Sequence, residues 1–245
     1  MSVKTNVTVF LVRTPGGYPT APRLDEDNEG VRVALTFDAE HPDRPVGRPG
    51  VEEELLALLG REGVRATFFI QGRWAQAYPE LADRIAGDGH VIGSHSHFHA
   101  RMPLLSDEGL RADIVQAGRA IREATGADPK PWFRCPWGHG ARDPRVGMAL
   151  RAQRYQHVGW DVVAEDWEPD RAPEDVARAV LAGITAAGDG AVVLLHAWPA
   201  STLEALPAIL EGLRDAGASV VTVEDLSDRD LSVTADPQTV DENPS

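Results

Sequence analysis

Short runs of β-branched and other apolar residues alternate along this chain with longer segments in which apolar residues recur every three or four positions. Brief apolar runs bounded by turn-forming residues are typical of buried strands. Seven such runs predict strands at residues 31–37, 66–70, 90–94, 131–135, 155–160, 191–196 and 218–223.

The segments between these runs have the apolar periodicity of amphipathic helices. They predict helices at residues 50–63, 78–89, 106–126, 143–153, 173–188 and 202–217. Several of the segments end at glycine, which favours the left-handed backbone that closes a helix. Ser106 and Asp143-Pro144 are residue types suited to begin one.

Nearly continuous apolar strands separated by amphipathic helices favour a parallel sheet covered by helices. Seven such units predict an α/β fold of the distorted (β/α) barrel type with about seven parallel strands, in preference to an open doubly wound sheet. We expect one folded domain at residues 31–226, an N-terminal extension at residues 1–30, and an acidic, disordered tail at residues 227–245.

Composition narrows the possible partners. The 245 residues include 24 basic and 38 acidic ones, and the formal net charge of −14 argues against nucleic acid or an anionic membrane as a partner. Solubility alone explains this charge equally well. Cys135 is the single cysteine, so no intrachain disulfide can form. The apolar run at residues 7–12 is too short for a signal-peptide core, and we therefore expect a cytoplasmic protein by default.

Three of the eight histidines lie within five positions of the segment GSHSHFHARM, residues 93–102. If the segment is a strand, His95, His97 and His99 share one face. If it is a turn, His95 and His99 come together and His97 lies apart. A solvated polar loop is the third possibility. The residues after the other strands discriminate among these, because the carboxyl ends of barrel strands meet on one face.

Chemically specific residues lie at or just after the carboxyl ends of five of the predicted strands. They are Asp38 and Glu40, His95 and His99, Arg134 to Gly138, Asp161 with Glu165-Asp166-Trp167, and His196. Two imidazoles and a carboxylate form a metal site that keeps positions open for water and substrate, and these ligands suit zinc, cobalt or another divalent ion. We therefore interpret His95, His99 and Glu40 as metal ligands. His97 then points away from the site and serves either packing or the support of a ligand.

With these residues in place, the sequence resembles the polysaccharide deacetylases, carbohydrate esterase family four. The resemblance rests on the ordered motifs TFDAE (36–40), HSHFH (95–99), RCPWG (134–138), EDW (165–167) and LLH (194–196), together with ATFFIQG (66–72). It covers residues 31–226, which it identifies as a polysaccharide deacetylase catalytic domain.

The resemblance implies a general base, Asp38, and a metal-binding carboxylate next to it. Relatives commonly have two adjacent aspartates here, but this chain has Ala39 in the second position, and alanine cannot bind a metal. Glu40 is the natural substitute, because its side chain is one methylene group longer. His41 is the alternative ligand.

The resemblance also assigns the remaining catalytic residues. Arg134 pairs with Asp38, and the backbone N–H of Trp137 helps to hold the oxyanion. Asp166 orients His196, which acts as the general acid. Tryptophan replaces the more usual tyrosine at position 137, a change that a backbone donor tolerates.

Two apolar residues are assigned to the pocket for the acetyl methyl group, namely Trp167 and Leu194. Val163 stands where relatives often have an aspartate, and Asp161 lies nearby as either a strand-end acid or a member of the site. Cys135 occupies a variable position, and we interpret it as structural.

Together these assignments predict a hydrolase with one divalent metal ion, most simply zinc or cobalt. It removes N-acetyl groups from an N-acetylglucosamine-containing saccharide and releases acetate and a free amine. Two alternatives stay open: a hydrolase of a small cyclic amide, ureide or O-acetyl ester on the same scaffold, and a non-catalytic saccharide-binding domain that lost its metal through Ala39. The expected partner is the N-acetylated saccharide, and no oligomeric state is predicted.

Overall fold

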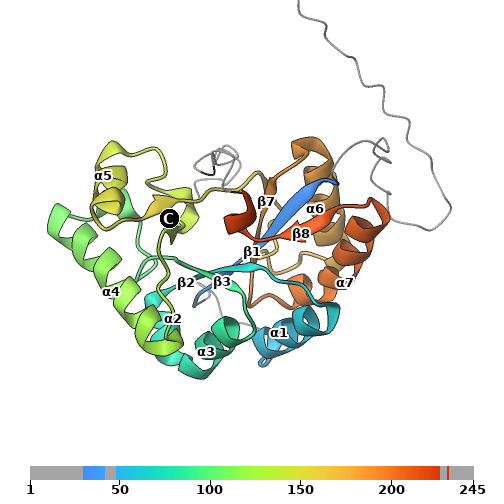
Figure 1. Cartoon of the computed structure of the whole chain (residues 1–245), viewed down its shortest axis with the longest axis horizontal. Helices are drawn as coiled ribbons and strands as arrows, with labels where there is room; N and C mark the ends of the chain where they lie inside the picture. Colours follow the sequence, from blue (N-terminus) through green and yellow to red (C-terminus); the bar gives the residue numbers. More distant parts are fainter. Residues whose placement is uncertain (1–29, 42–47, 227–230, 232–245) are drawn as a thin grey trace, which may run out of the picture.

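The computed structural model of the chain describes residues 30–41, 48–226 and 231 (Figure 1). The predicted N-terminal extension up to residue 29 and most of the predicted tail lie outside these residues. Of the tail, Leu231 is described. Its side chain is buried, and its carbonyl oxygen accepts a hydrogen bond from the Gly159 amide at 2.8 Å. Within the described ranges, no helix is both long and apolar enough to cross a bilayer.

The strands in the described residues form one sheet, and every pairing in it is parallel. They are β1 (Arg32–Ala39), β2 (Thr67–Ile70), β3 (Val91–Ser94), β4 (Trp132–Phe133), β5 (Gln156–His157), β6 (Val162–Val163), β7 (Ala191–His196) and β8 (Ser219–Val221). Their order is β5-β4-β3-β2-β1-β7-β6, and β8 pairs with β1. The longest strand, β1, pairs with three others, β2, β7 and β8.

The sheet curls because its two edge strands, β5 and β6, are consecutive in the chain. The short connection at residues 158–161 links one edge to the other, which produces the distorted (β/α) barrel. The predicted fold class is confirmed. The prediction of a single strand at 155–160 is wrong: Asp161 donates its amide to the Val192 carbonyl at 2.8 Å and accepts the Val192 amide at 2.9 Å. These bonds move the chain across to β7 and begin a separate strand, β6.

Seven α-helices lie in the described residues and form an arc outside the strands (Figure 1). They are α1 (Val51–Glu62), α2 (Gly72–Ala77), α3 (Pro79–Gly87), α4 (Asp107–Thr125), α5 (Pro144–Ala152), α6 (Pro173–Ala187) and α7 (Ala200–Asp215). Six match the predicted helices, and α2 is too short for its period to be visible in the sequence. As expected, Ser106 caps α4 and Asp143 caps α5 through their side-chain oxygens.

Alternation along the strands divides the core into two layers. On β1, Phe37 and Ala39 belong to a large apolar cluster shared with the helices. Ala34, on the opposite face, belongs to a second cluster with Phe69 and Leu194, and among the described residues no α-helical one contributes to that cluster. The second cluster therefore fills the barrel interior. Residues that continue this interior face beyond the strands point into the barrel mouth.

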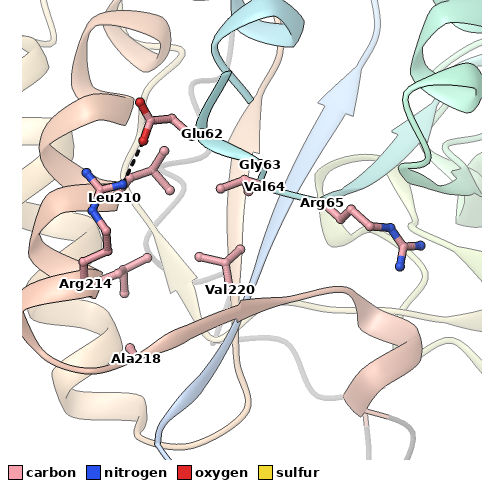
Figure 2. A pocket seen from close by; sticks show the side chains of 9 residues that line it. Glu62, Gly63, Val64, Arg65, Leu210, Arg214, Ala218 and Val220 are labelled. Carbon is pink, nitrogen blue, oxygen red and sulfur yellow. Dashed lines mark hydrogen bonds and ion pairs between the residues drawn. The ribbon is translucent and has the colours of Figure 1, made fainter. Parts of the chain in front are cut away.

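A cavity of about 230 Å³ lies at the other end of the barrel, where the strands begin (Figure 2). It is bounded by the end of α1, by α7 and by β8, and Glu62 and Arg214 form an ion pair of 2.8 Å on its wall. Figure 2 shows Arg65 extending away from this pair. No residue of the predicted site lines the cavity, so it is separate from the carboxyl ends of the strands.

Candidate metal centre and active site

Four strands end in polar residues that continue the interior face of the barrel. Asp38 on β1 and His196 on β7 are partners in the strand register. His95 directly follows β3, and Arg134 directly follows β4. Because the strands are parallel, their carboxyl ends open at one mouth. Residues distant in sequence, from 38 to 196, therefore meet there.

Glu40, His95 and His99 form a compact cluster at this mouth. Glu40 Oε2 lies 2.7 Å from His99 Nε2 and 3.2 Å from His95 Nε2. One ligand atom from each residue lies within 4.8 Å of the other two. The two imidazole centroids are 5.0 Å apart, so the loop after β3 turns back on itself and brings positions i and i+4 together. His97 lies outside the cluster.

Alternation along β1 explains why Glu40 reaches the cluster and Ala39 does not. Residues two apart on a strand share a face, so Asp38 and Glu40 both turn toward the mouth. Ala39 turns the other way and is fully buried in the helix-facing core. The strand geometry itself thus turns an acid two positions after Asp38 toward the mouth.

The chemistry of this cluster fits a divalent transition-metal ion. Glu40 Oε2 is buried and makes no directed hydrogen bond, although two imidazole nitrogens face it. Burial disfavours the charged carboxylate, but His95 and His99 outweigh burial and hold the pKa of Glu40 well below its ordinary value. An ionised carboxylate and two imidazole nitrogens thus converge on one point, as the ligands of a zinc-type ion do.

A backbone contact orients the first imidazole. His95 Nδ1 lies 2.9 Å from the carbonyl oxygen of Arg134. Nδ1 therefore carries a proton and donates it to that carbonyl, which leaves Nε2 facing Glu40 as the ring atom available to a metal ion. The backbone of the buried Arg134 thus also fixes which ring nitrogen of His95 faces the cluster.

Asp38 forms a buried ion pair beside the cluster. Arg134 is fully buried, and its Nη1 donates to Asp38 Oδ1 at 2.8 Å. The guanidinium also donates to the carbonyl oxygens of Val158 and Gly159 and lies 4.1 Å from the Phe69 ring centroid. These contacts compensate the guanidinium for lost hydration. The second carboxylate oxygen, Asp38 Oδ2, faces the cluster at 3.6 Å from an imidazole nitrogen.

His196 and Asp166 form the second buried pair. Asp166 Oδ1 lies 2.9 Å from His196 Nδ1, and Asp166 Oδ2 accepts from the His196 amide at 2.7 Å and from Thr202 Oγ1 at 2.6 Å. Burial lowers the pKa of His196, but Asp166, with smaller contributions from Glu40 and Asp38, outweighs burial and raises it to about 9. His196 therefore carries a proton at neutral pH, and its Nε2 faces the cluster.

Three apolar side chains flank these polar groups. Trp137 lies in a short 3-10 turn, η2 (Pro136–Gly138), and its ring centroid is 4.1 Å from that of His99. The Trp167 ring meets His196 edge-on at 5.3 Å. Leu194 lies on β7 two residues before His196 and is buried in the barrel interior. The mouth therefore has aromatic walls and an apolar floor.

Four other residues considered from the sequence do not join the cluster. The His41 ring faces Tyr78 at 5.6 Å, and His97 packs against Phe98. Asp161 bonds to the backbone of β7. Cys135 is buried, and burial raises the pKa of its thiol to about 12, so it is a structural residue and not a nucleophile.

Two buried polar residues that contact the site lie outside the motifs. Thr202 on α7 donates to Asp166, and Asp113 on α4 accepts two amides from the loop between the histidines. The sequence does mark Asp113 as a buried acid, because it interrupts an apolar stripe that includes Leu110 and Ile114. Nothing in the sequence marks Thr202, since a threonine within a helix is commonplace.

The chain is similar to known proteins in both sequence and fold. A family model described as polysaccharide deacetylase matches residues 25–158. The peptidoglycan-N-acetylglucosamine deacetylase PgdA of Listeria monocytogenes is 32% identical over 86% of this chain and 42% of its own length. A family 4 carbohydrate esterase from Streptomyces lividans, solved in complex with acetate, is 29% identical with a TM-score of 0.69, covering 86% of this chain and 95% of that one.

A third similar protein, solved from Bacillus anthracis, is described as a CE4 family pseudoenzyme. It is 27% identical with a TM-score of 0.71, and the match covers 81% of this chain and 66% of that one. The chain spans 53% and 42% of the first two curated relatives it matches. The matched model extends over more than half of the 245 residues, and so the chain belongs to the polysaccharide deacetylase family, carbohydrate esterase family four.

Proposed function

We propose that the chain is a metal-dependent hydrolase that removes N-acetyl groups from an N-acetylglucosamine-containing saccharide. The observation that carries the proposal is the meeting of a three-ligand cluster, a buried aspartate–arginine pair and a buried histidine–aspartate pair at one barrel mouth. The Listeria relative, a peptidoglycan-N-acetylglucosamine deacetylase by name, supports an N-acetylated saccharide as substrate. Residues 31–226 are the proposed catalytic domain.

Glu40, His95 and His99 would hold one divalent ion, with zinc or cobalt suited to two imidazoles and a carboxylate. When bound, the ion supplies Lewis acidity toward the acetamide carbonyl. The remaining chemistry belongs to side chains of this protein.

Hydrolysis of an amide requires a proton to leave water and a proton to reach the departing nitrogen. Asp38 is the base: Arg134 holds one of its oxygens at 2.8 Å, and the other oxygen faces the cluster. His196 is the acid, since Asp166 keeps it protonated at neutral pH. General acid–base catalysis of this kind contributes about 10²–10⁴-fold. The products are acetate and a free amino sugar.

The backbone N–H of Trp137 is proposed to donate to the oxyanion of the tetrahedral intermediate. A positioned donor of this kind is typically worth about 2.7–4 kcal/mol of transition-state stabilisation. The rings of Trp137 and Trp167 flank the polar groups, where apolar sugar and acetyl surfaces can pack against them.

The direct test measures acetate released from chitooligosaccharides of defined length, before and after chelation and after addition of zinc or cobalt. We expect chelation to abolish release and one of these ions to restore it. His99→Ala should lose metal and turnover together. His97→Gln, a change in the same loop outside the cluster, should retain both. Metal-independent release of acetate would overturn the proposed role of the ion.

Non-catalytic saccharide binding is the second candidate, favoured by the pseudoenzyme among the structural neighbours and by Ala39 in place of the usual acid. Parallel assays with acetylated xylan and cyclic imides test the alternative that the chain hydrolyses an O-acetyl ester or a small cyclic amide. A protein that binds chitooligosaccharide but neither binds zinc nor releases acetate from any of these compounds would be such a binding domain.

A further inference from the structure

The loop that carries the two histidine ligands has an unusual backbone. Ser96 has φ 61° and His99 has φ 55°, both in the left-handed region that non-glycine residues rarely occupy. Such a conformation persists only where surrounding contacts hold it. This loop therefore needs an external support, and the hydrogen bonds of its backbone identify that support.

The carbonyl groups of the loop are held by the start of α2. The Gly72 amide donates to the Ser96 carbonyl at 2.9 Å, and the Arg73 amide donates to the His97 carbonyl at 3.1 Å. A side chain at position 72 would collide with the His97 ring and with α4. Glycine is needed here so that the helix can approach the loop.

The amide groups of the loop are held by Asp113 on α4. Asp113 Oδ1 accepts the His97 amide and Asp113 Oδ2 accepts the Phe98 amide, each at 3.0 Å. The side chain is buried, so solvent does not replace either bond. Both oxygens are thus committed to the two residues that end the turn between the ligands. Asp113 is not itself a member of the metal-ligand cluster.

The third ligand is supported by Gln71, which directly precedes α2. The Gln71 amide donates to the Ala39 carbonyl at 2.9 Å, and Gln71 Oε1 accepts the His41 amide at 3.0 Å. These two bonds bracket Glu40 on both sides. Gln71 is buried like Asp113. One short segment, residues 71–73, therefore bonds to the backbone within two residues of each of the three ligands.

We propose that Asp113 and Gln71 are positioning residues that set the spacing of the three metal ligands by bonding the backbone on either side of them. This inference rests on the proposed metal centre. Gln71 fixes the segment in which Glu40 replaces the usual acid, and Asp113 closes the turn that brings His99 back beside His95. Neither residue belongs to the metal-ligand cluster.

The test is the zinc affinity of the full chain, measured at 25 °C by competition with a chromophoric chelator. Asp113→Asn removes one acceptor and points an NH2 group at a backbone N–H. Gln71→Met removes its side-chain acceptor at similar size. We expect each to weaken zinc binding by about 10–100-fold, as changes to groups that orient metal ligands do. Glu108→Gln, an exposed acid-to-amide change on α4, is the matched control and should bind zinc as the wild type does.

Two further readouts separate positioning from general support of the fold. Melting of the metal-free variants reports the fold alone, and the visible spectrum of bound cobalt reports ligand geometry. We expect the cobalt spectrum of each variant to differ from that of the wild type. Lower melting temperatures with unchanged zinc affinity and cobalt spectra would overturn the inference. A wild-type chain that binds no zinc would overturn the metal centre itself, a distinct outcome, and the inference with it. Gln71→Met supplies the same measurements should Asp113→Asn fail to fold.

Discussion

The pKa of His196 offers a quantitative test of the proposed general acid. Asp166 is the main group that holds the imidazole protonated, through a contact of 2.9 Å in a buried setting. Asp166→Asn keeps the shape of the side chain and removes its charge. The protonated acid is the active form, so activity is present below the pKa of His196 and is lost as pH rises through it. The variant should therefore lose activity at a lower pH than the wild type.

The expected loss of protonated His196 follows from the size of its pKa shift. The pKa of His196 is raised to about 9, and its ordinary value is about 6.5, a difference of about 2.5 units or about 3 kcal/mol. This is an upper estimate for Asp166, because Glu40 and Asp38 contribute to the shift. At pH 8.5 about three quarters of wild-type His196 would be protonated, against about 1% if the variant returned to 6.5.

The assay is kcat against pH from 5.5 to 9.5 for both proteins at equal metal content. A bound cation shifts the pKa of His196 in both proteins. The informative quantity is therefore the difference in pH between the alkaline limbs of the two kcat profiles. We expect a displacement of one to two and a half units, of the order set by the pKa shift, and a loss of activity that is largest above pH 8. Coincident alkaline limbs would refute His196–Asp166 as the proton donor.

Three further predictions concern individual residues. Phe37→Ala removes a fully buried ring stacked on Phe68 at 5.2 Å and should lower the free energy of unfolding in urea by about 3–5 kcal/mol; a loss below about 1 kcal/mol would contradict the packing described. Cys135 should resist iodoacetamide until the chain unfolds, because burial raises its pKa to about 12, and rapid labelling of the native protein would show an accessible thiolate. Thr202→Val should lower kcat several-fold at unchanged KM, because it removes one of the two hydrogen bonds that Asp166 Oδ2 accepts. Thr202→Ser should restore kcat, and equal kcat in all three proteins would remove Thr202 from the site.

Much of this fold is visible in the sequence because it rests on periodicity. The apolar alternation along β1 and β7 and the 3.6-residue periodicity of the helices predict both the elements and their parallel arrangement. The same alternation puts Asp38 and Glu40 on one face, so the position of the acid in the DAE segment was accessible to pattern alone.

The predictions from sequence fail where the structure depends on long-range contacts. β4, β5 and β6 have two residues each, too few for a pattern, and their places are set by neighbours such as Asp161 on the backbone of β7. The roles of Asp113 and Gln71 lie in bonds to the backbone of distant loops. No local pattern encodes such a bond, although an acid in the apolar stripe of α4 indicates a buried partner.

The central claim is that Glu40, His95 and His99 bind one catalytic cation, and anomalous scattering tests it most directly. Crystals of the zinc-loaded protein, measured at the zinc absorption edge, should give one strong peak at the barrel mouth. We expect that peak at about 2.0–2.2 Å from the Glu40 carboxylate and from the Nε2 atoms of His95 and His99. A zinc-loaded crystal with no peak at the mouth, or with a peak bound by the two histidines while Glu40 lies out of reach, would contradict the account.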